Sequence, residues 1–389
     1  MKKLLVLSLA MSFVLSSSLS VFAEMRGEDI EYKNLIQEIE GEDFYAGSYF
    51  VGDELHIVPT EENDLKSVFK NRNSSSFDIV IDEPQRYSYN ALEDAFLTLR
   101  ANRDKLGVSG YSIDVINNGL FVDAYNWTDE MKEEIKNITN IENITFRTDE
   151  GVIAENIAQD SGLDDSLNDT RAIEKARLGL GIEIDQNKGV NNAKASIGGT
   201  VKNGSSLGIL STAHGVNKGE KVYAFDVLNG SSVRGYIGTI TELRMKGNMD
   251  AVIIKLDNNS ALTPTSLTTK DDWIDSQGFA VDGKEGYILG SRSKAPYIIT
   301  NARADLNWND PDHDDVQWYE DMIEMKFTTS NQTTGGDSGG AIIRTYTSGN
   351  GALAGIYKGR RTIGGTVTAY GTRFDSIEDY YGIEMYQEK

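Results

Sequence analysis

The second half of this chain lacks the residue spacing that a helix needs. From about Ala172 onward, short runs rich in Val, Ile, Tyr and Thr alternate with turns of Gly, Asn and Ser. Many short strands joined by polar turns bury their apolar faces as a sandwich or as barrels. We therefore expect a mostly β domain over residues 172–389. The expected strands span residues 195–202, 206–211, 221–227, 233–241, 251–256, 324–328, 341–346 and 352–358, and only residues 374–381 predict a helix.

Residues 24–171 follow a different pattern, in which the order hairpin, helix, strand occurs twice. A helix that begins near Ser88 separates the two copies. The repetition predicts two similar α+β units, and the alternative is that a common pattern recurs by coincidence. The first copy comprises strand-like runs at 48–51 and 54–58, a helix beginning near Thr60 and a strand at 77–81, and the second comprises runs at 111–115 and 120–122, a helix opened by Thr128 and a strand at 144–146.

The first residues predict export from the cell. Met1-Lys2-Lys3 precedes an apolar run, residues 4–15, and the small residue Ala23 closes the stretch, which is typical of a secretory signal peptide over residues 1–23. A length of 389 residues favours two folded units after its removal. We expect an α+β unit over 24–171 and a β-rich unit over 172–389, joined by the polar stretch 161–171.

Composition excludes several classes of function. The chain has no cysteine, so disulfides and thiol catalysis are ruled out. Its formal net charge of −22 argues against a nucleic-acid partner, because phosphate binding needs a basic surface. The sequence has neither a basic amphipathic helix nor a lipidation signal, so we expect no membrane attachment.

A glycine-rich stretch, Gly336-Asp337-Ser338-Gly339-Gly340, can present a serine as a nucleophile. A serine hydroxyl needs a base to take its proton and N–H groups to hold the oxyanion that forms. Glycines permit a tight turn in which the N–H groups of Gly336 and Ser338 converge on one substrate oxygen. Taken alone, the stretch is equally compatible with a surface turn.

The search for a base is short, because the chain contains only His56, His214 and His313. His56 falls within a strand of the first half and is typical of an ordinary strand residue. His214 follows the strand-like run 206–211, where a turn can project an imidazole into a cleft. Asp250 opens the next apolar run, where a carboxylate is costly unless it has a partner such as a histidine. A structural histidine and a turn aspartate remain the alternatives.

The order His214, Asp250, Ser338 resembles that of the chymotrypsin-like serine proteases. Secreted bacterial members, the α-lytic protease and streptogrisin group, are more similar still. Residues 180–184 look like the start of their mature chain, and residues 197–201 and 207–211 look like the strands that lead to their histidine. The resemblance covers about residues 178–382.

This resemblance implies two antiparallel β-barrels with the active site between them. It implies that His214 is the general base, that Asp250 orients it, that Ser338 is the nucleophile, and that the N–H groups of Gly336 and Ser338 form the oxyanion hole. It requires no metal or cofactor. Residues 24–171 resemble the pro-region of bacterial relatives, which assists folding and blocks the cleft, although a permanent binding domain is the alternative. We expect a secreted, monomeric endopeptidase that is made as a zymogen and acts on proteins or peptides.

The resemblance also indicates a pocket for the substrate side chain. Lys358 stands where the family usually has a serine that touches the triad carboxylate. Positive charge from Lys358 or Arg360 would favour an acidic substrate side chain by Coulomb attraction, whereas a solvated turn at Arg360 is the simpler interpretation. The expected pocket residues are Gln332, Thr333, Tyr357, Lys358, Gly359, Arg360 and Tyr370.

The acidic stretch at residues 310–315 alternates aspartates as a calcium loop does, with Asp321 at the closing position. Asp315 replaces the glycine that the sharp turn of such a loop needs, so a solvated loop is favoured. Two non-enzymatic functions remain as alternatives. One is a catalytically silent binding protein on the same β scaffold, and the other is a glycine-rich adhesin.

Overall fold

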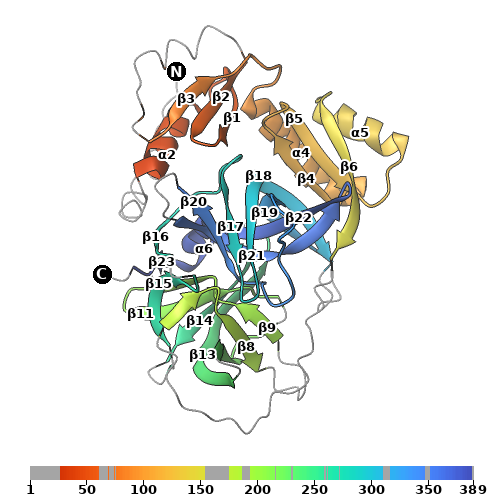
Figure 1. Ribbon diagram of the computed structural model, residues 1–389. Helices are drawn as coiled ribbons and strands as arrows, with labels where there is room; N and C mark the ends of the chain where they lie inside the picture. The colour runs from red at the N-terminus through yellow and green to blue at the C-terminus, as the bar shows by residue number, and fades with distance from the viewer. Residues whose placement is uncertain are drawn as a thin grey trace, which may run out of the picture.

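The computed structural model describes residues 27–60, 69, 74, 76–153, 175–185, 193–214, 216–228, 231–257, 260, 262–270, 272–309, 316–346 and 351–387. Strands dominate it, which confirms the mostly β expectation, and the helices lie chiefly in the N-terminal part. Figure 1 shows an α+β region, a central barrel built from the C-terminal strands, and another barrel, the first in the sequence, that lies farthest from the α+β region. The expected signal peptide and the linker at 161–171 lie outside the described residues, as does the helix near Thr60 except for Thr60 and Phe69.

The first barrel is an antiparallel sheet that closes through a bent strand. Its strands are paired in the order β10, β11, β14, β13, β12, β8, β9. Only Ile197 and Gly198 separate β9 from β10, so one bent segment pairs with β8 on one side and with β11 on the other. Inward-facing aliphatic side chains such as Ile209, Val252 and Ile254 fill the interior. The bounds are β8 Gly181–Asp185, β9 Ala193–Ser196, β10 Gly199–Asn203, β11 Ser206–Ser211, β12 Lys221–Leu228, β13 Ser231–Lys246 and β14 Met249–Leu256.

The second barrel is a closed ring of antiparallel strands. The order is β17, β20, β21, β22, β19, β18, and β18 pairs again with β17 to close the ring. Its interior is packed with Ile288, Tyr297, Ile342 and Ala369, among others. Two closed antiparallel barrels in sequence are the chymotrypsin-like fold. The bounds are β17 Glu285–Leu289, β18 Lys294–Asn309, β19 Val316–Phe327, β20 Ala341–Thr345, β21 Gly351–Ile363 and β22 Thr366–Arg373.

The N-terminal region contains two units of the same topology. In each, an antiparallel hairpin is followed by a third strand that lies parallel to the second strand of the hairpin. Helix α4 begins after Ser88, whose side chain accepts a hydrogen bond from the Ala91 N–H, and it packs between the units with α5 beside it. The bounds are α2 Gly27–Ile39, β1 Tyr45–Val51, β2 Glu54–Pro59, β3 Asp78–Ile81, α4 Tyr89–Leu106, β4 Gly110–Asp114, β5 Gly119–Ala124, α5 Asp129–Thr139 and β6 Ile144–Val152.

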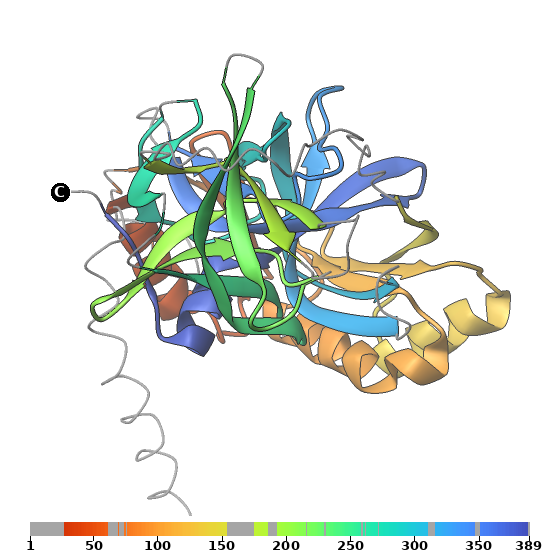
Figure 2. The ribbon, with the colours of Figure 1, turned by 90° about the horizontal axis from the view of Figure 1, so that it is seen from below.

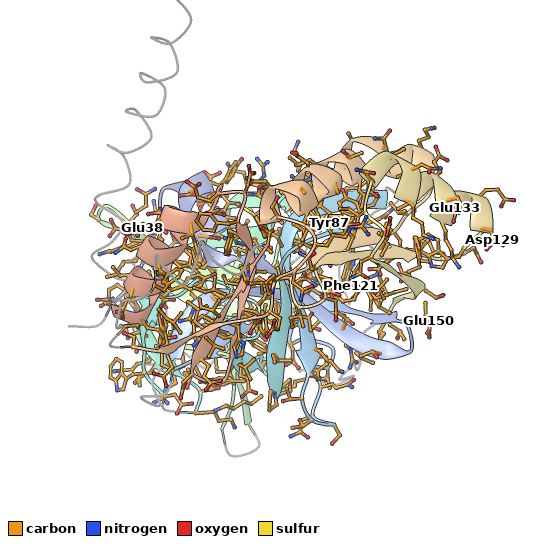
Figure 3. The ribbon with its side chains drawn as sticks, turned by 90° about the horizontal axis from the view of Figure 1, so that it is seen from above. Glu38, Tyr87, Phe121, Asp129, Glu133 and Glu150 are labelled. Atoms are coloured by element: carbon orange, nitrogen blue, oxygen red, sulfur yellow. The ribbon has the colours of Figure 1, made fainter. Side chains whose placement is uncertain are left out.

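The N-terminal region is joined to the second barrel by strand pairing at two places. β4 pairs with β18, and β6 pairs with β21, so the sheet of the second unit continues that of the barrel. Buried ion pairs accompany both contacts: Arg100 binds Asp305, and Arg361 binds Asp149. Seen from below, α4 and α5 project beyond the barrels (Figure 2). Asp129 and Glu133 lie at the outer tip of α5, far from Glu38 on α2 (Figure 3).

The remaining elements cover the space where the two barrels meet. Helix α6 packs with Phe374 and Ile377 against a core to which both barrels contribute. Its bounds, Phe374–Tyr381, agree with the expected terminal helix. The short strands are β7 Lys175–Leu178, β15 Thr263–Thr268, β16 Ile274–Gln277 and β23 Glu384–Met385.

Candidate active site

His214 and Asp250 are brought together on the first barrel. His214 lies in the turn after β11, and Asp250 is the second residue of the neighbouring strand β14. His214 Nδ1 lies 2.7 Å from Asp250 Oδ2. Because this carboxylate oxygen is an acceptor, we assign the proton of the neutral ring to Nδ1. Nε2 is then the basic nitrogen of the ring.

The Asp250 side chain is fully buried, and both of its oxygens have partners. Oδ1 accepts hydrogen bonds from the N–H groups of Ala213 and His214, at 2.8 and 3.0 Å, and from the Thr212 hydroxyl at 3.0 Å. Burial by itself raises the pKa of the Asp250 carboxyl, but the Lys358 ammonium and His214 outweigh it and hold that pKa far below its usual range. Asp250 is therefore a carboxylate at neutral and mildly acidic pH.

Ser338 lies in the turn between β19 and β20, on the second barrel. Gly336 has a φ of 93° and Gly339 a φ of 82°, a region of backbone conformation that favours glycine. Within the described part of the chain, neither the Gly336 N–H nor the Ser338 N–H donates a hydrogen bond. Two such donors beside a serine hydroxyl are suited to binding an oxyanion.

The turn is held from the first barrel by Ser196 at the end of β9. Its N–H donates to the Ser338 carbonyl and its hydroxyl donates to the Gly336 carbonyl, both at 2.8 Å. The Ser291 hydroxyl also donates to the Gly336 carbonyl, at 3.1 Å. Since the Gly336 carbonyl is fixed by two donors, the orientation of the neighbouring peptide groups is restricted.

The carboxylate of Asp337 is buried under the same turn and is held by neutral donors. It accepts hydrogen bonds from the Arg292 N–H at 2.8 Å, the Ser293 hydroxyl at 2.6 Å and the Thr334 N–H at 2.8 Å. These bonds link the segment before Ser338 to the loop between β17 and β18. The shape of the turn is thus supported by contacts within the second barrel as well as by Ser196.

The hydroxyl of Ser338 points to β21. Ser338 Oγ donates a 3.1 Å hydrogen bond to the Lys358 carbonyl. Between the described residues His214 and Ser338 no direct hydrogen bond is formed. A serine hydroxyl can change its partner by rotation about one side-chain bond, and catalytic hydrogen bonds are often absent before substrate binds.

Lys358 contacts the carboxylate of the pair as well as the serine. It is the extra residue of a β-bulge in β21, between the pairs Tyr357↔Gly371 and Gly359↔Tyr370, and a bulge re-aims a side chain. Its Nζ lies 2.6 Å from Asp250 Oδ2, and its side chain has no exposed surface. The sequence suggested that Lys358 carries charge into the substrate pocket, whereas the structure directs its ammonium to Asp250.

Four of the other six expected pocket residues form two hydrogen-bonded pairs. Gln332 and Arg360 are joined, because the Arg360 guanidinium donates to Gln332 Oε1 at 3.0 Å. Thr333 and Tyr357 are buried and their hydroxyls are 2.6 Å apart. The two that remain have their contacts elsewhere: Gly359 lies against the Trp308 indole, and the buried Tyr370 hydroxyl donates to Glu324.

The described residues form no metal site. Within those ranges, no three His, Asp or Glu side chains are grouped to hold a metal ion. Asp321 binds Arg100 and Arg303, while residues 310–315, with His313, lie outside the described part. His56 stays in β2, where its Nδ1 lies 2.7 Å from Asp82. No helix of the described chain has the length and apolar character that crossing a bilayer requires.

Sequence reasoning missed Ser196, Ser291 and the contact between Lys358 and Asp250. Ser196 and Ser291 carry no motif, because serines near strand ends are common. Their role depends on Gly336, which is 140 residues from Ser196 and 45 from Ser291. For Lys358 a signal existed. A lysine in an otherwise apolar run, Leu353 to Tyr357, is expected to have a buried acid as its partner.

Comparison with known proteins gave fold-level similarity only. The sequence matches no protein-family profile and no curated protein. Solved structures that resemble it include Thermobifida fusca protease A (16% identity, TM-score 0.40) and Cellulomonas bogoriensis chymotrypsin (17%, 0.40), each over 55% of this chain and 100% of the other. The α-lytic protease homolog N4 resembles it over 54% of this chain and 98% of the other (15%, 0.38). These similarities are distant, so the fold is assigned from the strand pairings above.

Proposed function

We propose that this protein is a serine endopeptidase in which Ser338 is the nucleophile and His214 is the general base. One observation carries the proposal. The buried Asp250 carboxylate accepts from Nδ1 of His214. The same carboxylate binds the Lys358 ammonium, and the Lys358 carbonyl accepts from the Ser338 hydroxyl. These contacts link a base whose tautomer is set to a serine beside two N–H donors, which supports the proposal.

The reaction follows from these groups. His214 Nε2 takes the proton of Ser338 as Oγ attacks the scissile carbonyl carbon, and the N–H groups of Gly336 and Ser338 hold the oxyanion. The tetrahedral intermediate collapses when His214 gives this proton to the leaving amine, which breaks the C–N bond. A water that is deprotonated by His214 then attacks the ester carbonyl. The bond between the acyl carbon and Oγ breaks as His214 returns the proton to Ser338, and the carboxylic acid product leaves. Asp250 stabilises the imidazolium in both steps.

The proposal requires the Ser338 hydroxyl to leave the Lys358 carbonyl. Rotation about the Cα–Cβ bond would turn Oγ towards His214 and free that carbonyl. The carbonyl is then available to a peptide N–H, as strand addition of a substrate along β21 would require. Substrate binding and activation of the serine are therefore coupled in this proposal.

We further propose that residues 24–171 are a pro-region. β6 lies along the edge of β21 on which a substrate strand would approach Lys358. Val152 of β6 pairs with Arg361, and the Ile153 N–H donates to the Arg360 carbonyl at 3.1 Å. A substrate strand that approaches Ser338 along this edge would compete with β6. The bound N-terminal region would thus inhibit the enzyme, and cleavage between β6 and β7 would begin its release.

Export as a monomer, with residues 1–23 as the signal peptide, completes the proposal. A protease with self-inhibition built into its precursor can leave the cell before it becomes active. N-terminal sequencing of the protein from the culture medium tests both cleavages. A mature chain that begins between residues 154 and 174 supports the pro-region, whereas a chain that keeps β1–β6 and still hydrolyses peptides favours a permanent domain.

Hydrolysis of casein and of short peptides tests the enzymatic proposal. The wild-type protein is compared with Ser338→Ala, and circular dichroism confirms that the variant is folded. Loss of hydrolysis in the variant, by at least about a thousandfold, is expected. Equal activity of the two proteins would eliminate Ser338 as nucleophile. Inactivity of the processed wild-type protein would favour the alternative, a silent binding protein on this scaffold.

A further inference from the structure

Lys358 shares one oxygen of the Asp250 carboxylate with His214. The Lys358 Nζ and the His214 Nδ1 lie 2.6 and 2.7 Å from the same atom, Oδ2. The protonated ring and the ammonium are therefore within roughly 5 Å of one another, close enough for strong repulsion in a buried site. The lysine side chain has no exposed surface, so solvent ions screen this repulsion only weakly.

Two aromatic rings and a carboxylate surround the Lys358 ammonium. Its ammonium lies 4.1 Å from the centre of the Tyr319 ring and 4.8 Å from that of Trp308. Aromatic faces attract a cation, and Asp250 supplies the opposite charge. Both contacts hold the ammonium against Oδ2.

Few other ionisable groups of the described chain face the carboxylate. Tyr381 of α6 donates its hydroxyl to the Ala251 carbonyl, and burial raises the pKa of Tyr381 well above its usual range, so it stays neutral. From β22, the neutral Thr372 hydroxyl accepts from the Asp250 N–H at 2.9 Å. The electrostatic environment of Oδ2 is therefore set mainly by Asp250, His214 and Lys358.

We propose that Lys358 is a positioning residue that extends the activity of the site to lower pH, because its ammonium opposes protonation of His214 while it holds Asp250 in place. The proposal rests on the proposed function, in which only the unprotonated His214 is active. With a neutral residue at position 358, the Asp250 carboxylate would lose its ammonium partner and keep its contact with His214. The ring would then take up a proton at a higher pH, and the acidic limb of the activity profile would move with it.

The titration of His214 can be followed without any catalysis. The variants Lys358→Met and Lys358→Ser are made in a Ser338→Ala background, in which the full chain cannot cleave itself. The Met side chain can keep the contacts with the Tyr319 and Trp308 rings. The Ser variant is the second choice if the Met variant does not fold, because its hydroxyl is a small neutral hydrogen-bond donor. With only three histidines in the chain, ¹³C-histidine NMR resolves the His214 ring, which is assigned by its loss in His214→Ala.

We expect the midpoint of the ring titration to rise by roughly one to two pH units in both variants, the size of one uncompensated charge at this separation. Lys284→Met is the matched control. Lys284 is a buried lysine of the same barrel whose ammonium lies 2.7 Å from Glu28, not Asp250, and its loss should leave the midpoint unchanged.

Two outcomes overturn the proposal. One is a folded Lys358 variant whose midpoint stays within a few tenths of a unit of that of its parent. The other is an equal shift in the Lys284 control. With Ser338 restored, the acidic limb of kcat/KM should move by the same amount as the midpoint. A shifted midpoint in a chain that hydrolyses no peptide would leave this electrostatic role intact and refute only the proposed protease activity.

Discussion

Ser196, at the end of a strand in the first barrel, donates its N–H to the carbonyl oxygen of Ser338 in the second, at 2.8 Å. The hydroxyl of Ser196 binds the Gly336 carbonyl of the same turn and accepts a hydrogen bond from the Ser291 N–H. The nucleophile turn is therefore clamped across the junction of the two barrels. Its geometry depends on how the barrels are packed together.

Ser196→Ala should slow catalysis while substrate still binds. The variant keeps the N–H bond to Ser338 but leaves the Gly336 carbonyl with the Ser291 hydroxyl as its remaining side-chain donor, so the oxyanion donors become less well ordered. We expect kcat to fall about tenfold with a small change in KM, and the free energy of unfolding to fall by about 1–2 kcal/mol. Ser206→Ala, at the exposed far end of β11, is the control. A Ser196→Ala kcat as high as that of the control would show that the clamp is dispensable.

Arg360 should set a preference for acidic substrates. Its half-buried guanidinium is bonded to the neutral Gln332, whereas the Lys358 ammonium is directed to Asp250. In peptides that differ only at the residue before the cleaved bond, we expect Glu to be cleaved faster than Leu. Arg360→Gln should reduce the ratio of the two kcat/KM values about tenfold, since one screened charge pair contributes on the order of 1 kcal/mol.

Arg361→Gln serves as the control for the specificity experiment. Arg361 is the next residue of β21, but its side chain points to the opposite face, towards Asp149 and the Tyr125 hydroxyl. The ratio for Glu over Leu should be unaffected in this variant. Equal rates for the Glu and Leu peptides with the wild-type protein would show that Arg360 does not interact with the substrate side chain.

Asp282 should make the stability of the precursor depend on pH. Burial, with smaller contributions from neighbouring carboxylates, raises the pKa of Asp282 to about 7. The folded chain therefore holds a proton at Asp282 that the unfolded chain releases above about pH 4, so stability falls as pH rises from about 4 to 7 and is level above that range. Because the side chain is only half-buried, we expect a loss of roughly 1–2 kcal/mol.

Chemical unfolding of the Ser338→Ala precursor at pH 5 and at pH 8 measures this effect. Asp282→Asn keeps an acceptor for the Ala302 N–H and has no proton to lose. The difference in stability between the two pH values should therefore be smaller in Asp282→Asn than in its parent. The same difference in both proteins would assign the pH dependence to other groups.

The buried pair Asp149–Arg361 should hold the N-terminal region on the second barrel. Asp149→Asn leaves the Arg361 charge buried without its carboxylate, which costs about 3 kcal/mol. After cleavage of the linker, gel filtration should show faster separation of the two parts, and peptide hydrolysis should appear sooner. Glu150→Gln, at an exposed neighbouring position (Figure 3), should behave as the wild type does. Separation at the same rate in both variants would exclude this pair as the anchor.

The strands of the first barrel could largely be predicted from the sequence, whereas β17, β18 and β22 of the second barrel were not. Alternating or continuous apolar runs with glycine turns indicated β11 with its exact bounds and β14 within two residues. The long strands β18 and β19 were mostly missed, because they carry buried charged residues such as Asp305 and Glu324. These carboxylates are paired with Arg100 and Arg147 of the N-terminal region. Such compensation is non-local and leaves no periodic signal in the chain.

The candidate site could be predicted only as a set of residues. The order of His214, Asp250 and Ser338 is visible in the sequence, but the direction of each side chain depends on register. A single bulge at Lys358 turns the ammonium to Asp250 rather than to the pocket, and no local pattern predicts that bulge. The clamp of Ser196 on Gly336 likewise arises only when two separate barrels come together.

Labelling with a serine-directed fluorophosphonate tests the role of Ser338 most directly. The protein is labelled after the N-terminal region has been removed, and the modified peptide is identified by mass spectrometry. We expect one phosphonylated residue, Ser338, and a rate of labelling that falls at least about a hundredfold in folded His214→Ala. A folded, processed protein that is not labelled at Ser338, or is labelled equally fast without His214, would contradict a serine protease mechanism.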